Sequence, residues 1–459
     1  MNSKLTPDQR RKIISMLREG LDRSSIALAV QVTPGQVSAV AAHLTMKTYK
    51  DDSSGTDVPR HSTEATSRPH RKHATKHIGL RIPIGSDTKT GGIRFWSPTP
   101  DSGTPNPHLL IIGESGSGKT YATQCICAEL AQRGFATIVF DFGQGFSLNT
   151  TPPEFAEFAL PVEINVGRDG ININPLQIFP SDIHGPVNVA QRIADTFARV
   201  YPTIGIQQHA ILRDAILEAF LGAGIDPRSK KTWSLKPPRF SDLKLTLESI
   251  AQDKTHPARK FAAAVASHIS TVFVFNTFRS TGLDLSWERI LSFGGQTYIV
   301  QLKGLENLLE RVVTELLLWN LIGFIESLGP GALRCLVLLD EAHRLSFASN
   351  SPVEKLLREG RKFGIGVVLA SQQPEDFSSV AFTNTASKLV FNVTDERGAV
   401  ARQIARKSSG DSSFLALVRQ LGSLSRGHAC FLTSDAAGIV QVTDFADRIT
   451  RWTHSSRPV

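Results

Sequence analysis

Cysteine is scarce in this sequence of 459 residues, which contains only four. The four cysteines form no CxxC pair and no cluster with histidine, so their spacing indicates neither a zinc site nor a disulfide framework. They are Cys125, Cys127, Cys335 and Cys430. A reducing compartment is the simplest interpretation.

Long apolar runs are missing as well. The most apolar stretch, residues 316–328, is too short to span a bilayer and contains Glu326. The N-terminus opens with polar residues, where a secretory signal would carry an apolar segment. We therefore expect a soluble, cytoplasmic protein that has no membrane partner.

Positive charge is in excess. Lysine and arginine number 51 against 42 aspartate and glutamate, which gives a formal net charge of +9. This balance fits a polyanionic partner such as nucleic acid, although many basic proteins bind nothing acidic. With 41% hydrophobic and 20% charged residues, the chain can bury a full core, and we expect one large domain with a smaller one beside it.

Residues 1–45 are predicted to form three short helices, the first of them starting at a Thr-Pro-Asp-Gln capping pattern at residue 6. The run IALAVQVTPGQVSAVAAHL, which starts at Ile26, resembles the helix-turn-helix family. In such a module the outer face of the third helix can reach base edges in a major groove. The candidates for DNA contact are Gln36, Ser38 and His43. A three-helix module that binds protein is the alternative.

Residues 46–76 read as a flexible basic linker. They have little apolar content, and residues 60–77 contain five Lys/Arg and four His against a single Glu64. From residue 77 two short strands joined by a polar turn are predicted, and one α/β domain then extends to residue 459.

Six apolar runs separated by helical patterns predict the buried strands of that domain. Runs of this kind favour a mostly parallel sheet covered on both faces. Amphipathic segments between about residues 185 and 295 predict a helical insertion. The expected strands are Leu109–Ile112, Thr137–Phe142, Thr297–Leu302, Cys335–Leu339, Val367–Ser371 and Leu389–Val393.

The sequence GESGSGKT at residues 113–120 matches the P-loop pattern, between an apolar strand and a predicted helix over 121–133. Its glycines allow backbone N–H groups to surround phosphates, and the helix N-terminus adds partial positive charge. Lys119 would reach the β and γ phosphates of ATP, and Thr120 would ligate Mg²⁺. The predicted nucleotide-binding residues are Gly113, Glu114, Ser115, Gly116, Ser117, Gly118, Lys119 and Thr120.

The run LVLLDEAHRL at residues 336–345 ends a second apolar strand in two acids. Asp340 would hold Mg²⁺, and Glu341 is the candidate base for the attacking water. The letters DEAH name a helicase class, but the 221 residues between Lys119 and Asp340 and the missing later motifs argue against it. Asp141 begins a DFG triplet without a kinase catalytic loop, so it is interpreted as a strand-end acid near the nucleotide.

The stretch REGRKFGIGVVLASQQPEDFSSVAFTNTASKLVFNV, residues 358–393, resembles the HerA/FtsK superfamily of ring-shaped DNA motors. The resemblance covers about residues 105–445 and includes INPLQIF at 173–179. It implies that Gln372 senses the γ-phosphate and that Arg361, or else Arg358, acts as a finger toward the neighbouring subunit. A solvated basic helix face is the alternative for both arginines. The β-barrel typical of HerA is not recognisable in the N-terminal part.

The resemblance implies a RecA-like ATPase that couples ATP hydrolysis to movement along, or remodelling of, double-stranded DNA. It is most similar to HerA-like and DptH-like ATPases of DNA processing and phage defence. This implies a homo-oligomeric ring, a hexamer, that works with a separate nuclease or effector. Two alternatives stay open: a secretion or conjugation ATPase, and a DNA-binding regulator that ATP switches without translocation.

Overall fold

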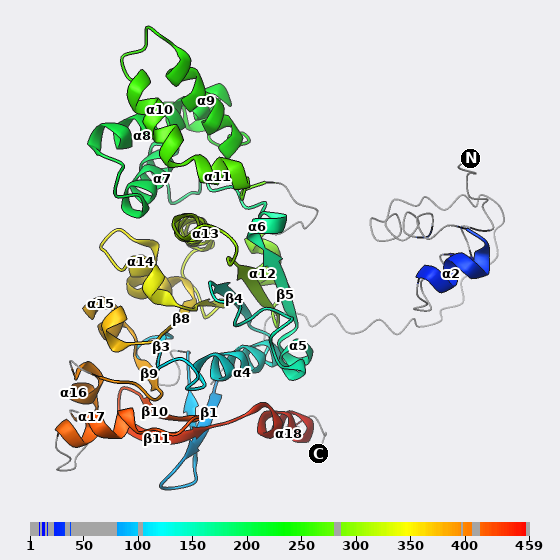
Figure 1. Ribbon diagram of the computed structural model, residues 1–459, viewed down its shortest axis with the longest axis vertical. Helices are drawn as coiled ribbons and strands as arrows, with labels where there is room; N and C mark the ends of the chain where they lie inside the picture. The colour runs from blue at the N-terminus through cyan, green and yellow to red at the C-terminus, as the bar shows by residue number, and fades with distance from the viewer. Residues whose placement is uncertain are drawn as a thin grey trace. The chain divides into compact units, whose positions relative to one another are not determined.

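The computed structural model describes residues 80–99, 104–279, 286–395, 398–405 and 414–455, together with 23–32 and the single positions 9, 12, 13, 16 and 37. The chain divides into two compact units, Met1–Thr75 and Lys76–Val459. Both units are shown in Figure 1.

In the N-terminal unit the structure describes one helix of several residues, α2 (Arg23–Val30). Ile26, Ala27 and Val30 are buried on its inner face, as the sequence predicts, and they cluster with Ile13 and Val37. The DNA-contact candidates Gln36, Ser38 and His43 lie outside the described residues. The helix-turn-helix interpretation therefore stays a prediction.

The second unit is built on a sheet in which the described strands number eleven, in the order β2-β1-β11-β10-β9-β3-β8-β7-β4-β6-β5. From β9 to β5 all neighbouring strands are parallel. The strands are β1 (Ile82–Asp87), β2 (Ile93–Trp96), β3 (Leu109–Ile112), β4 (Ala136–Asp141), β5 (Pro161–Asn165), β6 (Thr297–Gln301), β7 (Cys335–Leu339), β8 (Ile365–Ser371), β9 (Ser387–Val390), β10 (His428–Leu432) and β11 (Ala437–Val442). The predicted α/β class with a mostly parallel sheet is confirmed.

The predicted strand positions hold with small corrections. β3 and β7 match the prediction residue for residue, whereas β8 begins two residues earlier, at Ile365. The strand predicted at Leu389–Val393 is instead β9, Ser387–Val390. The two short strands predicted after residue 77 are β1 and β2, which pair antiparallel. The antiparallel pairing of β9, β10, β11 and β1 was not predicted, because β10 and β11 are short and β11 is only partly buried, which leaves no long apolar run.

The helices of this unit cover both faces of the sheet, and two apolar clusters fill the space between them. The helices outside the insertion are α4 (Lys119–Gln132), α5 (Pro153–Ala159), α6 (Val166–Asp169), α13 (Asn307–Ser327), α14 (Pro352–Glu359), α15 (Ser379–Asn384), α16 (Ala399–Ala405), α17 (Phe414–Gly422) and α18 (Phe445–Ser455). The apolar stretch 316–328 belongs largely to the buried helix α13. Among the described residues, every helix is too short or too polar to cross a membrane.

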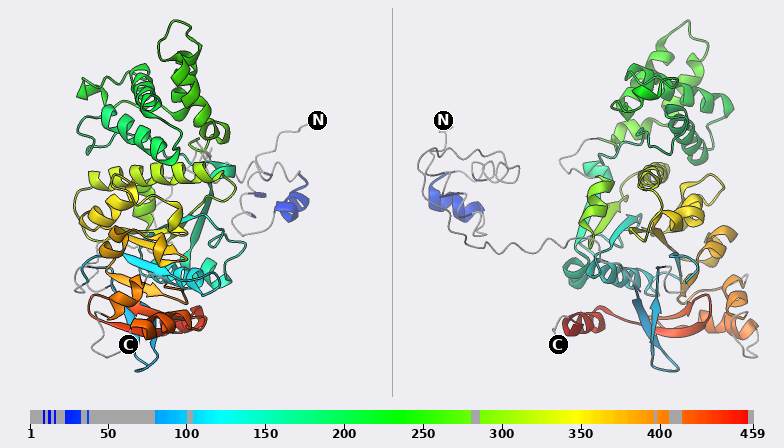
Figure 2. Two further views of the ribbon diagram at one scale, coloured as in Figure 1. Left: turned by 60° about the vertical axis from the view of Figure 1, so that its left-hand side comes forward. Right: turned by 180° about the vertical axis from the view of Figure 1, so that it is seen from behind.

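Helices also occupy the region of the predicted insertion. They are α7 (Pro186–Val200), α8 (Ile206–Gly222), α9 (Phe240–Gln252), α10 (Arg259–His268), α11 (Ser270–Phe275) and α12 (Trp287–Phe293). In both views of Figure 2 the green helices α7 to α11 gather at one end of the unit, and the orange and red C-terminal elements lie at the other. α12 contacts β4 instead.

Candidate nucleotide-binding site

The predicted site residues converge at the carboxyl edge of the parallel sheet. β3, β8 and β7 are neighbours, with Ile112 opposite Ser371 and Leu339 opposite Leu369. The P-loop follows β3, Gln372 follows β8, and the two acids follow β7. This is the edge at which open α/β sheets bind ligands.

The P-loop has the backbone geometry that its glycines permit. Gly116 and Gly118 have φ values of 78° and 110°, which other residues rarely adopt. Gly118 caps α4, which starts at Lys119, so the first N–H groups of the helix have no partner within it. The buried Ser117 hydroxyl also has no hydrogen-bond partner in the described part of the chain. These donors fit a bound phosphate chain.

Lys119 lies inside this loop. Its ammonium group donates to the carbonyl oxygens of Gly113 and, at 3.0 Å, Glu114. Burial lowers the pKa of Lys119, and the charges of Glu341, Asp340 and Glu114 oppose that shift. The lysine is therefore held between the P-loop and the acid end of β7.

Thr120 and Asp340 both lie beside Gly145. A Cβ atom built on Gly145 would lie 2.8 Å from Thr120 Cγ2 and 3.4 Å from Asp340 Oδ2. Asp340 is buried, and burial, together with the charges of Asp141 and Glu341, raises its pKa to about 7. A hydroxyl and a carboxylate next to this excess of negative charge fit the oxygen ligands that Mg²⁺ prefers.

Glu341 stands at the end of β7 in an unusual conformation. Its φ is 51°, in the left-handed region that a residue with a Cβ adopts at a cost of about 1 kcal/mol. Its two carboxylate oxygens each lie 3.4 Å from the amide Nε2 of Gln372. Glu341 and Gln372 therefore form a pair at the ends of adjacent strands.

His343 takes part in a local hydrogen-bond chain with Ser371 and Asp376. The Ser371 hydroxyl donates to Asp376, so it accepts from His343 Nδ1 at 3.0 Å. Nδ1 of His343 also lies 3.4 Å from Oε2 of Glu341. These hydrogen bonds join the turn after β7 to the end of β8. They thereby align the segments that carry Glu341 and Gln372.

Asp141 organises the loop next to the P-loop. Its carboxylate accepts hydrogen bonds from the N–H groups of Gly143, Gly145 and Phe146 and from the Gln301 side chain, at 2.8 to 3.2 Å. These bonds account for its lone pairs, so Asp141 positions Gly145 beside Thr120. The sequence placed Asp141 near the nucleotide but missed this structural role.

The two arginines lie away from this site. Arg361 precedes β8 and donates to the carbonyl oxygen of Pro105, which precedes β3, so it lies at the amino edge of the sheet. The seven residues of β8 separate this edge from the edge that carries the P-loop by roughly 20 Å. Arg358 is exposed and pairs with Glu354 one turn back on α14. Neither arginine reaches Lys119 of its own chain.

The C-terminal segment brings a further residue to the P-loop. The N–H of Gly427 donates to the carbonyl of Ser117 at 3.3 Å, and Glu114 accepts a 3.0 Å hydrogen bond from Thr394. The exposed Arg426 precedes Gly427 and thus lies beside the phosphate-binding loop. No motif marks Arg426, because only the fold of the antiparallel strands brings it here.

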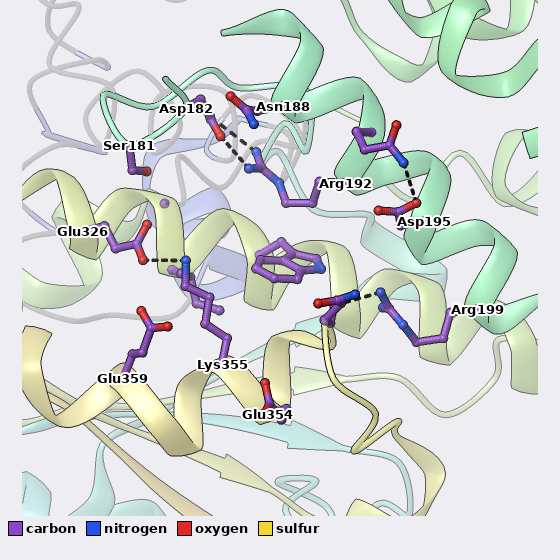
Figure 3. A pocket seen from close by; sticks show the side chains of 15 residues that line it. Ser181, Asp182, Asn188, Arg192, Asp195, Arg199, Glu326, Glu354, Lys355 and Glu359 are labelled. Atoms are coloured by element: carbon purple, nitrogen blue, oxygen red, sulfur yellow. Dashed lines mark hydrogen bonds and ion pairs between the residues drawn. The ribbon is translucent and has the colours of Figure 1, made fainter. Parts of the chain in front are cut away.

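A charged cavity of about 440 Å³ lies between α7, α13 and α14, and Figure 3 shows its lining. Its cations already have carboxylate partners: Arg192 binds Asp182 at 2.6 Å, and Lys355 binds Glu326 at 2.7 Å. Arg199 pairs with Glu315 and donates to the Asn350 carbonyl at 2.9 Å. The cavity is therefore a salt-bridged seam between insertion and core, with no spare positive charge for an anion.

The sequence is similar to known proteins over the same region. The family described as "Helicase HerA, central domain" matches residues 105–321. The DNA double-strand break repair helicase HerA of Saccharolobus solfataricus is 23% identical over 341 residues, which cover 71% of this chain and 61% of the relative. A probable DNA double-strand break repair helicase HerA of Methanocaldococcus jannaschii is 22% identical over 70% of this chain and 68% of the relative. The chain thus spans less than two thirds of the first relative.

Two solved structures have the same fold. VirB4 of Thermoanaerobacter pseudethanolicus superposes with a TM-score of 0.58 at 17% identity, over 79% of this chain and 96% of that one. The plasmid coupling protein TrwB in complex with ADP and Mg²⁺ superposes with a TM-score of 0.50 at 16% identity, over 73% and 85% of the two chains. At such identities the likeness concerns the fold alone.

Proposed function

We propose that this chain is a P-loop ATPase of the HerA/FtsK type, which hydrolyses ATP to move along, or remodel, double-stranded DNA. The observation that carries the proposal is the convergence of Lys119, Thr120, Asp340 and Glu341 at the carboxyl edge of β3 and β7. Gln372 joins them from β8.

Each residue has a definite part in the proposed hydrolysis. Lys119 leaves its carbonyl partners to bind the β and γ phosphates. Thr120 and Asp340 hold Mg²⁺, which neutralises phosphate charge when bound. Glu341 accepts the proton of the attacking water, and Gln372, 3.4 Å from it, orients that water beside the γ-phosphate.

DNA is proposed as the substrate for two reasons. The chain carries a formal charge of +9, and both curated relatives are named as DNA double-strand break repair helicases. The helix-turn-helix pattern of residues 1–45 and the basic linker 46–76 would add a recruiting contact, because lysine and arginine bind phosphates regardless of sequence.

A ring of identical subunits, with a hexamer as the expected size, is part of the proposal, and the position of Arg361 supports it. At the amino edge of the sheet it is roughly 20 Å from its own P-loop, so it can stabilise phosphate charge only in a neighbouring chain. Arg358 is the second candidate, but its pairing with Glu354 would have to break first.

Hydrolysis is tested by two substitutions at the site. Lys119→Ala should abolish ATP binding and turnover, and Glu341→Gln should abolish turnover while ATP still binds. Retained ATPase activity in both variants would reject the site. Mixing Arg361→Ala subunits with Lys119→Ala subunits should restore part of the activity, because one interface in the mixture keeps both groups. No recovery at any ratio would reject the trans finger.

The motor is tested by the length of the DNA. A translocase should hydrolyse ATP faster on long than on short duplexes at equal nucleotide concentration, whereas an ATP-switched regulator should respond to both alike. Duplex DNA without effect on turnover would favour a secretion or conjugation ATPase. Deletion of residues 1–76 should weaken DNA binding and reduce its salt dependence; unchanged binding would assign this part to protein docking.

We further propose that cleavage of DNA, in DNA processing or phage defence, belongs to a separate nuclease or effector. The test is incubation of the purified chain with linear and circular duplexes, ATP and Mg²⁺. Intact DNA with full ATP turnover is the expected result, and cut DNA would overturn the proposal of a separate enzyme.

A further inference from the structure

The segment between α8 and α9 carries a cluster of positive charge. Residues 226–239, called the basic loop below, contain five cations and a single acid, Asp226. All five cationic side chains are exposed. They are Arg228, Lys230, Lys231, Lys236 and Arg239.

The basic loop has a fixed backbone. The N–H of Asp226 donates to the Thr232 hydroxyl at 2.9 Å, and the Trp233 indole donates to the Asp226 carbonyl at 3.0 Å. The Trp233 ring also packs closely on α7, since a Cβ atom built on Gly185 would lie 2.5 Å from it. The cations therefore project from an ordered support, which lowers the entropy lost when they bind a partner.

The charge of the basic loop is not neutralised by neighbouring acids. In the described ranges none of its five cations forms an ion pair with a carboxylate. The two nearest acids in the sequence accept backbone hydrogen bonds instead: Asp226 from the N–H of Arg228 at 2.8 Å, and Asp242 from the N–H of Arg239 at 2.7 Å. Lys230 lies over the Trp233 ring, 5.8 Å from its centroid, which leaves its charge without an acidic partner. Clustered cations that lack acidic partners favour a polyanionic ligand.

A cavity of about 280 Å³ next to the loop narrows the class of polyanion. Its lining combines amides, cations and one aromatic ring and contains no carboxylate: Asn172, Asn174, Gln177, Lys236, Pro237, Arg239 and Phe278. The buried Oδ1 atom of Asn172 has no hydrogen-bond partner among the residues that the structure describes. Asn174 and Gln177 already donate to the carbonyls of Pro238 and Ile178, so Asn172 and the carbonyl oxygen of the exposed Gln177 side chain are the amide groups left for a ligand. Such groups for sugar edges, beside cations for phosphates, fit nucleic acid better than a lipid headgroup.

We propose that the basic loop and this cavity form a DNA-binding surface of the helical insertion, separate from the N-terminal module. The inference rests on the proposed function, in which DNA is the substrate. It adds the place on the ATPase unit at which the DNA is bound. Phosphates of the duplex contact the lysines of the loop, and the amides of the cavity contact the adjacent sugar edge.

Hydrogen bonds connect this surface to the ATPase site. The Asn174 amide donates to the carbonyl of Pro238 in the loop, and the Asn320 amide of α13 donates to the Asn174 carbonyl, both at 2.8 Å. α13 also carries Glu310, which binds Arg344 three residues after Glu341 at 2.8 Å. DNA on the basic loop is therefore expected to raise the rate of ATP hydrolysis.

The test uses the full chain with three lysines neutralised, Lys230→Gln, Lys231→Gln and Lys236→Gln. The matched control neutralises three exposed lysines elsewhere, Lys89→Gln, Lys254→Gln and Lys260→Gln. Affinity for a fluorescent duplex is measured between about 50 and 200 mM salt. Loss of three phosphate contacts should reduce the slope of log Kd against log salt by about 2 to 3 and weaken binding by about 10- to 100-fold.

Turnover with and without duplex separates the possible outcomes. The expected result is a loss of DNA stimulation in the loop variant, normal behaviour of the control, and recovery when the three lysines are replaced by arginine. If DNA stimulates ATP turnover of the loop variant as strongly as that of the wild type, the proposed DNA-binding surface is wrong, whereas the proposed function stands. No binding or stimulation by DNA in the wild type would overturn the proposed function itself. Loss of binding to phosphatidylserine vesicles with unchanged DNA binding would assign the loop to a membrane and also reject the proposal.

Discussion

A buried ion pair holds α18 to α4, the helix that follows the P-loop. Removal of this ion pair should lower the free energy of unfolding of the ATPase unit. Arg448 of α18 and Glu129 of α4 are each 1% exposed, and Nη1 of Arg448 lies 2.9 Å from Oε1 of Glu129. Glu129 also accepts a hydrogen bond from Trp452 at 3.2 Å and pairs with Arg133. Arg448→Leu would leave Glu129 buried without its closest α18 cation.

The expected cost can be worked out from these contacts. Breaking a buried pair by removing one partner costs about 3 to 5 kcal/mol, because the remaining charge stays desolvated. Arg133 still neutralises part of the Glu129 charge, so the lower end, about 3 kcal/mol, is expected for Arg448→Leu. Replacing both residues by leucine should cost far less than the sum of the two single substitutions, because no buried charge then remains.

Urea unfolding followed by tryptophan fluorescence measures these free energies, and Trp452 reports directly on the pair. The control is Arg168→Leu, which removes an exposed ion pair with Asp169 and should leave the free energy of unfolding almost unchanged. The reasoning is refuted if Arg448→Leu costs no more than this control, or if the double substitution equals the sum of its parts.

Three further outcomes are expected. Burial lowers the pKa of His108 from 6.5 to about 3, so the unfolded chain takes up a proton that the folded chain refuses. The free energy of unfolding should therefore fall by about 1.4 kcal/mol per pH unit below pH 6.5, and urea titrations of His108→Gln at several pH values should lack this contribution. Gly145→Ala should weaken binding of a fluorescent nucleotide about 10-fold through the contact with Thr120, while Gly143→Ala, 4.0 Å from its nearest neighbour, should not. Arg426→Ala should lower kcat/KM for ATP about 10-fold, the value of one charge-assisted contact, and equal values for Arg426→Ala and the exposed control Arg419→Ala would remove Arg426 from the site.

The parts of the fold that sequence predicts are those that local pattern determines. The P-loop lies between a strand of four buried residues and a helix, and the acids end a strand of five, so both features follow from short contiguous segments. Their convergence also follows, because parallel strands bring their carboxyl ends to one edge.

The remainder depends on contacts between distant segments. Glu129 and Arg448 are 319 positions apart, and neither residue stands in a recognisable motif. Arg426 reaches the P-loop only because β10 continues the sheet antiparallel to β9. Gly145 is one of 35 glycines, and its importance appears only when Thr120 and Asp340 are both found next to it. Such relations arise from tertiary packing and have no signature in a single sequence.

The proposed role of Arg361 needs a second subunit, so neither the sequence nor the structure of one chain is enough to predict it. The resemblance selected it as a finger, and its geometry excludes action on its own nucleotide, because it lies at the amino edge beside Pro105 while Lys119 lies at the carboxyl edge. The same distance that rules out a role in cis is what a ring requires, where the amino edge of one subunit meets the carboxyl edge of the next. Recovery of activity in mixed subunits therefore tests the assembly and the residue together, and a chain that hydrolyses ATP fully as a monomer would reject both.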